Sequence, residues 1–272
     1  MRSRLALAAA LRTVITSIVM KLIDFFAQRL PEASSGTGNS RSNASLAFDS
    51  ARRAMVERQI RARDVRSPRV LEAMASVPRH LFVSPEYAAE AYSDSPLPIG
   101  FGQTISQPYM VAAMADALSL EGHEKVLEIG AGSGYQAAVL SLLAREVIAV
   151  ESQPALAVAA RELLLRLGYQ NIRIESGDGT EGWTLDSPNA APYDAILVTA
   201  GAPSIPPPLV AQLSEGGRLV IPVGPSAQQD LVRLVKRDGR TTRESLFACR
   251  FVPLVGRYGW PAGAQMQGPN RG

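Results

Sequence analysis

Residues 126–135 read V-L-E-I-G-A-G-S-G-Y, and this stretch decides the fold. Its first half is a short apolar run ending in glycine, which is typical of a buried parallel strand that turns directly into a helix. Gly130, Gly132 and Gly134 permit a tight turn and let backbone amides approach a ligand closely. A helix expected over residues 136–144 directs its free N–H groups at the same place. The stretch therefore predicts a nucleotide-sized pocket.

The residues around the glycines indicate which nucleotide binds. A dinucleotide fingerprint, G-x-G-x-x-G, would have its third glycine where this chain has Tyr135. Glu128 stands two residues before the first glycine, where its charge repels a pyrophosphate and attracts a cation. S-adenosylmethionine carries a sulfonium and an ammonium group but no phosphate. The charge balance favours this cofactor over NAD.

Two further acids follow later strands. Glu151 ends the apolar run 147–150, about 20 residues after the glycine turn, the usual distance for a carboxylate that holds ribose hydroxyls. Asp178 lies in the G-D-G turn 177–179, after an expected strand at 172–174, where it could reach the adenine. Taken singly, these features also fit a tight connection, a helix N-terminal acid and a turn residue. Their order on successive strand ends favours a cofactor site.

The composition indicates neither a structural metal site nor an intrachain disulfide. The chain has one cysteine, Cys249, so it cannot form an intrachain disulfide. One cysteine and two histidines, His80 and His123, cannot build a structural zinc site. No metal is expected.

The net charge of +3 is unevenly placed. Residues 1–83 have 14 basic and 6 acidic side chains, whereas residues 84–272 have 14 basic and 19 acidic ones. A basic front can bind nucleic acid or an anionic membrane. The arginines are scattered at helical spacing, however, which favours a solvated face, and neither partner is expected.

The first fifty residues are expected to lie outside the folded domain. Residues 1–30 alternate apolar runs with single cations, and these runs are too short to span a bilayer. A secretory signal competes with this interpretation, but Arg12 interrupts the first apolar run and no small-x-small cleavage site follows. The segment is interpreted as an N-terminal apolar and basic extension whose role, like the start codon, stays open. Residues 31–50, rich in Ser, Gly and Asn, predict a flexible linker.

Residues 51–256 are expected to form one domain. Residues 51–106 have a helical pattern followed by a loop, and residues 107–256 alternate strands with helices. Right-handed crossovers then require a mostly parallel, doubly wound α/β sheet. A closing pair of strands is predicted around a hairpin at 238–239. Residues 257–272 are expected to be a disordered tail.

Over residues 51–256 the chain resembles the protein-L-isoaspartate (D-aspartate) O-methyltransferases. The most specific part runs from L-P-I-G at 97–100 to Q-T-I-S-Q-P at 103–108, because the glycine strand alone occurs in many methyltransferases. This part lies within the matching stretch 97–111, and the other matching stretches are 77–83, 126–135, 177–182, 193–203, 216–224 and 251–254. The resemblance implies a Rossmann-like class I S-adenosylmethionine-dependent methyltransferase, with a seven-stranded sheet and an N-terminal helical part.

The resemblance also implies a function and a site. Such an enzyme is cytoplasmic and transfers a methyl group from S-adenosylmethionine to the α-carboxylate of L-isoaspartyl or D-aspartyl residues in damaged proteins. It releases S-adenosylhomocysteine and starts repair through a succinimide. The sequence does not reveal the oligomeric state, and a monomer is expected. The serine of the T-I-S-x-P segment, here Ser106, is the active-site residue. The cofactor positions implied are Thr104, Ile105, Glu128, Gly130, Gly132, Glu151, Asp178 and Gly179.

The acceptor chemistry explains the residues expected at the site. A carboxylate with a pKa of about 4 is already ionised at neutral pH and needs no general base, so neither histidine is required. Ser106 is expected to hold the carboxylate in line, although it also fits an N-cap for the helix that starts near Pro108. The loop 93–102 and the segment 200–207 are expected to be the peptide-binding walls.

Two rival functions remain open. A methyltransferase of the same fold could act on a small molecule or a nucleic acid, although a nucleic-acid enzyme would need basic residues around the pocket, where this domain is net acidic. A non-catalytic module could instead bind S-adenosylmethionine and a protein partner. Methyl transfer to an isoaspartyl peptide, compared with the same peptide containing aspartate, separates the three.

Overall fold

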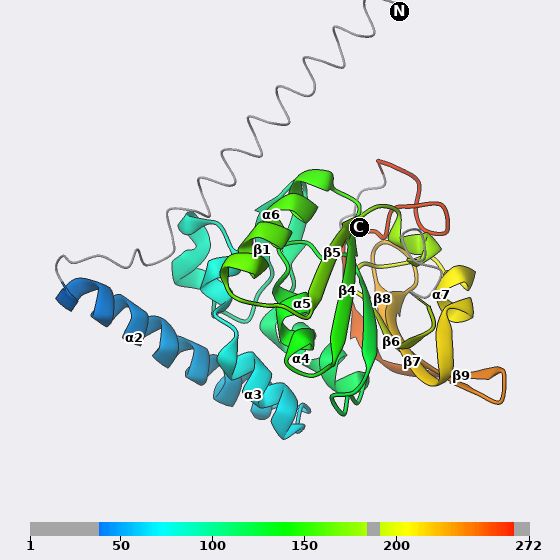
Figure 1. Ribbon diagram of the computed structural model, residues 1–272, viewed down its shortest axis with the longest axis horizontal. Helices are drawn as coiled ribbons and strands as arrows, with labels where there is room; N and C mark the ends of the chain where they lie inside the picture. Colours follow the sequence, from blue (N-terminus) through cyan, green and yellow to red (C-terminus); the bar gives the residue numbers. More distant parts are fainter. Residues whose placement is uncertain (1–37, 184–190, 264–272) are drawn as a thin grey trace, which may run out of the picture.

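A seven-stranded sheet forms the centre of the domain (Figure 1). The computed structural model describes residues 38–183 and 191–263. The strand order in the sheet is β5-β4-β3-β6-β7-β8-β9. In chain order the strands are β3 (Lys125–Ile129), β4 (Glu146–Glu151), β5 (Ile172–Ser176), β6 (Tyr193–Val198), β7 (Leu213–Val223), β8 (Gln229–Arg237) and β9 (Arg240–Cys249).

The sheet is parallel from β5 to β7 and antiparallel beyond it. Ile129, the last residue of β3, is in register with Val150 on one side and Val198 on the other, so the three strands end together. Strand order reverses between β3 and β6, and such a switch point is where ligands bind in open α/β sheets. The expected doubly wound seven-stranded sheet is confirmed, including the closing hairpin between β8 and β9.

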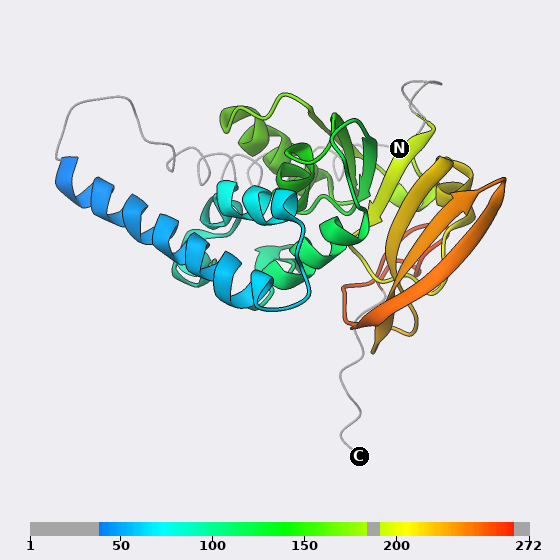
Figure 2. The same cartoon turned by 90° about the horizontal axis from the view of Figure 1, so that it is seen from below.

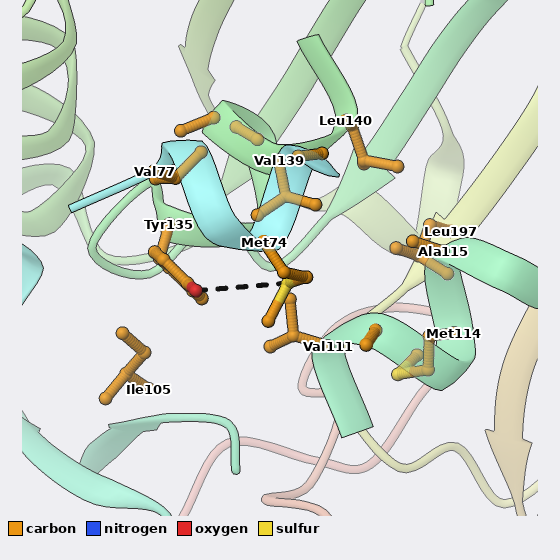
Figure 3. Close-up of a cluster of buried hydrophobic side chains, with 14 of the residues drawn as sticks. Met74, Val77, Ile105, Val111, Met114, Ala115, Tyr135, Val139, Leu140 and Leu197 are labelled. Carbon is orange, nitrogen blue, oxygen red and sulfur yellow. Dashed lines mark hydrogen bonds between the residues drawn. The ribbon is translucent and has the colours of Figure 1, made fainter. Parts of the chain in front are cut away.

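Each face of the sheet has its own apolar core, because successive strand residues point to opposite faces. Val126 belongs to the core under α3 (Pro68–Ser76), α4 (Pro108–Ala117), α5 (Tyr135–Ser141) and α6 (Pro154–Arg166), whereas Leu127 belongs to the core that includes Leu209 of α7 (Pro207–Ala211). Figure 3 shows the first core, where the Tyr135 hydroxyl donates to the Met74 sulfur at 3.9 Å. Helices therefore cover both faces of the sheet.

The N-terminal part differs from the predicted linker. Helix α2 (Gly38–Met55) occupies most of the segment 31–50 and leads into a π-helix, η1 (Val56–Arg61). Figure 2 shows α2 extending beyond the rest of the domain. The ring of Phe48 stacks on that of His80 at 4.0 Å, a contact that local composition does not reveal. Residues 1–30 lie outside the described chain, and no helix within 38–183 and 191–263 has the length and apolar content to cross a membrane.

The predicted loop at 93–102 contains half of a β-hairpin. Strand β1 (Leu97–Gly100) pairs with β2 (Gln103–Ile105) through a turn made of Phe101 and Gly102. Both turn residues have positive φ, 53° and 71°, as a two-residue hairpin turn of this hand requires. The hairpin leads through Ser106 and Gln107 directly into α4.

The first part of the predicted disordered tail, residues 257–263, is corrected, and residues 264–272 lie outside the described chain. We call residues 252–263 the C-terminal strap. Within it, the Arg257 N–H donates to Asp178 Oδ2 at 2.7 Å and the Tyr258 N–H to Thr180 Oγ1 at 3.1 Å. The Trp260 indole N–H donates to Gly201 O at 3.0 Å. These three hydrogen bonds hold the strap against the turns that follow β5 and β6.

Candidate active site

A cavity of about 410 Å³ lies at the carboxyl ends of β3, β4 and β6. Its walls come from the glycine turn, the end of β4, residues 103–106 and the C-terminal strap. We call it the donor cavity. The predicted site residues that line it are Thr104, Ile105, Ser106, Gly130, Gly132, Glu151 and Gly179. The structure thus brings together seven of the nine predicted residues, and it places Glu128 and Asp178 outside the lining.

The glycine turn needs its glycines for conformation and for space. Gly130 and Gly132 have φ values of 96° and 54°, a region that side chains rarely adopt. A Cβ on Gly130 would lie 2.5 Å from Thr199 Oγ1, and one on Gly132 would lie 3.1 Å from Ile99 Cδ1. The Gly130 N–H donates to Val150 O at 2.8 Å, which ties the turn to β4. The turn is therefore fixed from both neighbouring strands.

Glu151 is the acid at the end of β4, and backbone amides hold its carboxylate. Oε2 accepts the Gly132 N–H at 2.8 Å, and Oε1 accepts the Gln153 N–H at 2.8 Å. Oε1 also accepts the Ser152 hydroxyl at 3.4 Å, whereas Oε2 keeps a lone pair for a further donor. The side chain is 5% exposed, and it presents these acceptors to the donor cavity.

Glu128 lies on the same face of the sheet, on the neighbouring strand, but it is fully buried. Neither carboxyl oxygen has a hydrogen-bond partner within the described chain. Burial, and to a lesser extent the charge of Glu151, raises the pKa of Glu128 well above its ordinary value of 4.5. This shift favours the neutral form of the Glu128 carboxyl in the ligand-free protein.

Asp178 makes hydrogen bonds to the turn after β5 and to the C-terminal strap. Its Oδ1 accepts the backbone N–H of Thr180 at 2.9 Å and the Thr180 hydroxyl at 2.7 Å. Its Oδ2 accepts the Arg257 N–H described above. A Cβ on Gly256 would lie 2.1 Å from Asp178 Oδ1, so the strap passes close to this carboxylate. Asp178 joins the turn after β5 to the strap, while Gly179 next to it reaches the donor cavity.

A second cavity of about 720 Å³ adjoins the first. We call it the acceptor cavity. Four residues line both cavities: Thr104, Ser106, Thr199 and Val252. Three of the four carry hydroxyl groups, so the passage between the cavities is polar on several sides. The hydroxyls of Thr104 and Ser106 lie at this border, whereas the Thr199 hydroxyl donates to Gly130 O at 2.7 Å.

Most of the acceptor cavity was missed by the sequence analysis. Residues 247–252 at the end of β9 form one wall, and Arg63 and Tyr109 contribute to another. The Arg63 guanidinium lies 3.5 Å from the centroid of the Tyr109 ring, and its Nη1 donates to Asp94 Oδ2 at 3.1 Å. Tyr109 belongs to the matching stretch 97–111 and residues 251–252 belong to the stretch 251–254, whereas Arg63 belongs to no matching stretch.

The predicted peptide walls are only partly at the site. Pro96, from the loop 93–102, lines the acceptor cavity, and Ala200, from the segment 200–207, lines the donor cavity. The next residues of that segment pair with other backbone instead, Gly201 with Pro253 and Ala202 with Val223. The segment 200–207 therefore supports the strap. The wall of the acceptor cavity that was predicted for this segment is formed by the end of β9.

Neither histidine lines a cavity of the site, and the one cysteine that does is held protonated. His80 is stacked on Phe48, and the side chain of His123 is 73% exposed. Cys249 lines the acceptor cavity, but burial raises the pKa of its thiol to about 12 and keeps it protonated. Among the residues that the structure describes, no three His, Cys, Asp or Glu side chains are grouped as a metal site would need.

The parallel sheet, the glycine turn at its switch point and the carboxylate of Glu151 define a Rossmann-like class I methyltransferase. The family model described as protein-L-isoaspartate(D-aspartate) O-methyltransferase matches residues 50–259. The protein-L-isoaspartate O-methyltransferase of Geobacter metallireducens is 58% identical over 214 residues, which are 78% of this chain and 97% of that protein. The enzyme of the same name from Methanoculleus marisnigri is 56% identical over 209 residues, 77% of this chain and 93% of its own.

Solved structures agree with the sequence relatives. A structure of a protein-L-isoaspartate O-methyltransferase superposes with a TM-score of 0.68 at 28% identity, over 78% of this chain and 67% of its own. A Plasmodium falciparum protein described by the same activity, solved with S-adenosyl-L-homocysteine, gives 0.64 at 26% identity, over 75% of this chain and 98% of its own. The chain belongs to the protein-L-isoaspartate(D-aspartate) O-methyltransferase family.

Proposed function

We propose that this chain methylates the α-carboxylate of L-isoaspartyl and D-aspartyl residues in damaged proteins, with S-adenosylmethionine as donor and S-adenosylhomocysteine as product. The observation that carries the proposal is the pair of adjoining cavities with hydroxyl groups between them. One cavity has the features of a nucleoside site, and the other is open to a peptide. Family membership fixes the class of reaction, and this arrangement supplies the place for it.

The residues of the donor cavity fit S-adenosylmethionine. Oε2 of Glu151 has a lone pair left for a ribose hydroxyl, Oε1 can take the second one in place of the Ser152 hydroxyl at 3.4 Å, and the glycines at 130 and 132 leave room for close approach. Thr104, Ile105 and Gly179 complete the walls, and Asp178 contributes by holding the strap. Glu128, whose buried carboxyl lacks a partner in the described chain, is assigned to the ammonium end of the cofactor. When bound, the cofactor supplies an electrophilic methyl group on a sulfonium.

Ser106 is assigned to the acceptor carboxylate. Its side chain borders both cavities and has no hydrogen-bond partner among the described residues, so its hydroxyl is available to donate. The acceptor is ionised at neutral pH, and the protein needs to supply orientation and exclusion of water rather than a base. Ser106 is not the N-cap residue of α4, because Gln107 has that position and Ser106 lies one residue earlier.

The acceptor cavity is assigned to the peptide around the damaged residue. Its lining is mainly aromatic and aliphatic, with Arg63 at one wall, which suits an extended chain of varied sequence. After methylation, the next backbone amide nitrogen attacks the ester carbonyl and releases methanol, which closes a succinimide. Hydrolysis of this ring returns some normal aspartyl bonds, and neither step requires this protein.

Several further expectations belong to the same proposal. We assign the protein to the cytoplasm as a monomer that works without a metal ion and without nucleic acid. The single cysteine suits a reducing compartment. Every step described above uses hydrogen bonding and positioning, and none of them requires a metal.

The test is transfer of labelled methyl groups to a synthetic isoaspartyl peptide and to the same peptide with normal aspartate. We expect base-labile methyl ester on the first peptide and none on the second. Equal labelling of both peptides would contradict the proposed specificity. Cofactor binding without transfer to either peptide would favour a binding module instead.

A further inference from the structure

Thr199 lies at the point where the two cavities and the two halves of the sheet meet. It directly follows β6, opposite Gly130 of the glycine turn, because Val198 pairs with Ile129. It is one of the four residues that line both cavities. A group that passes from the donor cavity to the acceptor cavity therefore passes beside this side chain.

Hydrogen bonds join Thr199 to the glycine turn at two places. Its N–H donates to Ile129 O at 2.9 Å. Its hydroxyl lies 2.7 Å from Gly130 O and 3.0 Å from Ile129 O. The hydroxyl has one proton, and Ile129 O already accepts a backbone N–H, so the shorter contact to Gly130 O is the better use of it.

Thr199 and Gly130 are also closely packed against each other. Gly130 has a φ of 96°, and a Cβ there would lie 2.5 Å from Thr199 Oγ1. The threonine hydroxyl thus fills the room that the missing side chain leaves. Glycine has unusual backbone freedom, and the clamp on its carbonyl removes that freedom at the junction of the cavities.

We infer that Thr199 is a positioning residue for methyl transfer, which acts by holding the Gly130 peptide in the orientation that aligns the donor cavity with the acceptor cavity. The inference rests on the proposed function. Its physical basis is that transfer between two bound groups is sensitive to small displacements, and a shift of about 1 Å can cost on the order of 100-fold in rate. Thr199 touches neither the reacting oxygen nor the methyl group in this account.

The test compares Thr199→Val, which keeps the shape and removes the hydroxyl, with Thr199→Ser, which keeps the hydroxyl. Single-turnover methyl transfer to the isoaspartyl peptide is measured with saturating S-adenosylmethionine. We expect the rate to fall about tenfold in Thr199→Val and to stay within about twofold of wild type in Thr199→Ser. The KM for peptide and the Kd for S-adenosylhomocysteine should each change less than about threefold in both variants, since Glu151 and Ser106 are intact.

Thr241→Val, on the exposed part of β9, is the matched control and should behave as wild type. Calorimetric binding of S-adenosylhomocysteine shows that each variant is folded. An unchanged rate in Thr199→Val, or an equal loss in Thr199→Ser, would overturn the inference, as would a rate loss explained wholly by weaker cofactor binding. A wild-type protein that does not methylate the isoaspartyl peptide would instead defeat the proposed function, and the role of Thr199 with it.

Discussion

The Gly132 N–H donates to Oε2 of Glu151 at 2.8 Å, and this bond joins the turn after β3 to the end of β4. One carboxylate thereby holds the turn and lines the donor cavity. The Gln153 N–H, on Oε1, fixes the other end of the same carboxylate.

Glu151→Gln should weaken cofactor binding. An amide has one oxygen, so its NH2 group must face either the Gly132 or the Gln153 N–H, and a donor then meets a donor. We expect the Kd for S-adenosylhomocysteine to rise at least tenfold by calorimetry. Glu244→Gln, at an exposed carboxylate on β9, is the control and should leave the Kd unchanged. An unchanged Kd in Glu151→Gln would contradict the assignment.

Glu128→Gln should change how stability depends on pH. The folded-state pKa of Glu128 is raised, so its contribution is complete below about 4.5 and is lost as pH rises toward the folded-state pKa. Glutamine is neutral throughout and has no such loss. In the absence of cofactor, we expect the variant to gain stability relative to wild type between pH 5 and pH 8, with a slope of at most about 1.4 kcal/mol per pH unit. Urea unfolding at the two pH values measures this, and a difference that is independent of pH would show that Glu128 is ionised in the folded chain.

Ser106→Ala should slow methyl transfer while cofactor still binds. Loss of one hydrogen bond to a charged acceptor costs about 1.5–3 kcal/mol, or roughly 10- to 100-fold in kcat/KM for the isoaspartyl peptide. The Kd for S-adenosylhomocysteine should stay close to wild type. Ser76→Ala, at the end of α3 and away from both cavities, is the control. Near-normal turnover in Ser106→Ala would remove Ser106 from the mechanism.

Asp178→Asn should loosen the C-terminal strap. The carboxylate accepts three donors, and the amide nitrogen of asparagine would face one of them. We expect faster proteolytic cleavage within residues 255–263 and a several-fold weaker affinity for S-adenosylhomocysteine, because the strap lines the donor cavity. Glu181→Gln removes only the exposed ion pair with Arg257 and should have little effect. Equal protection from proteolysis in Asp178→Asn and wild type would show that other contacts hold the strap.

Local pattern was enough to predict the centre of the fold. The apolar run of β3, its glycines and Glu151 lie within 26 residues of one another in the sequence, and each follows from strand and turn chemistry over a short stretch. The family resemblance supplied Ser106 and its neighbours. The assignment of Thr104 and Ile105 to the cofactor also came from the resemblance, and both residues line the donor cavity.

Contacts between residues far apart in the sequence could not be predicted from local sequence patterns. The ring of Phe48 stacks on that of His80, which lies 32 positions later in the sequence. The segment around Phe48 has the composition of a linker, but it is helical. The Arg257 N–H is bound by an acid 79 positions earlier, so a segment with the composition of a tail is ordered. Arg63, Tyr109 and Phe247 come together in the acceptor cavity from three separate segments. Contacts of this kind depend on the completed topology rather than on any single stretch.

The C-terminal strap also bears on how the protein is made. During synthesis the ribosome releases the glycine turn and Glu151 well before residues 252–263, yet those later residues complete the donor cavity. A nascent chain that still lacks them has the nucleoside-binding turn but an open cavity. The donor cavity therefore gains its full lining late in translation, after all seven strands of the sheet have been made.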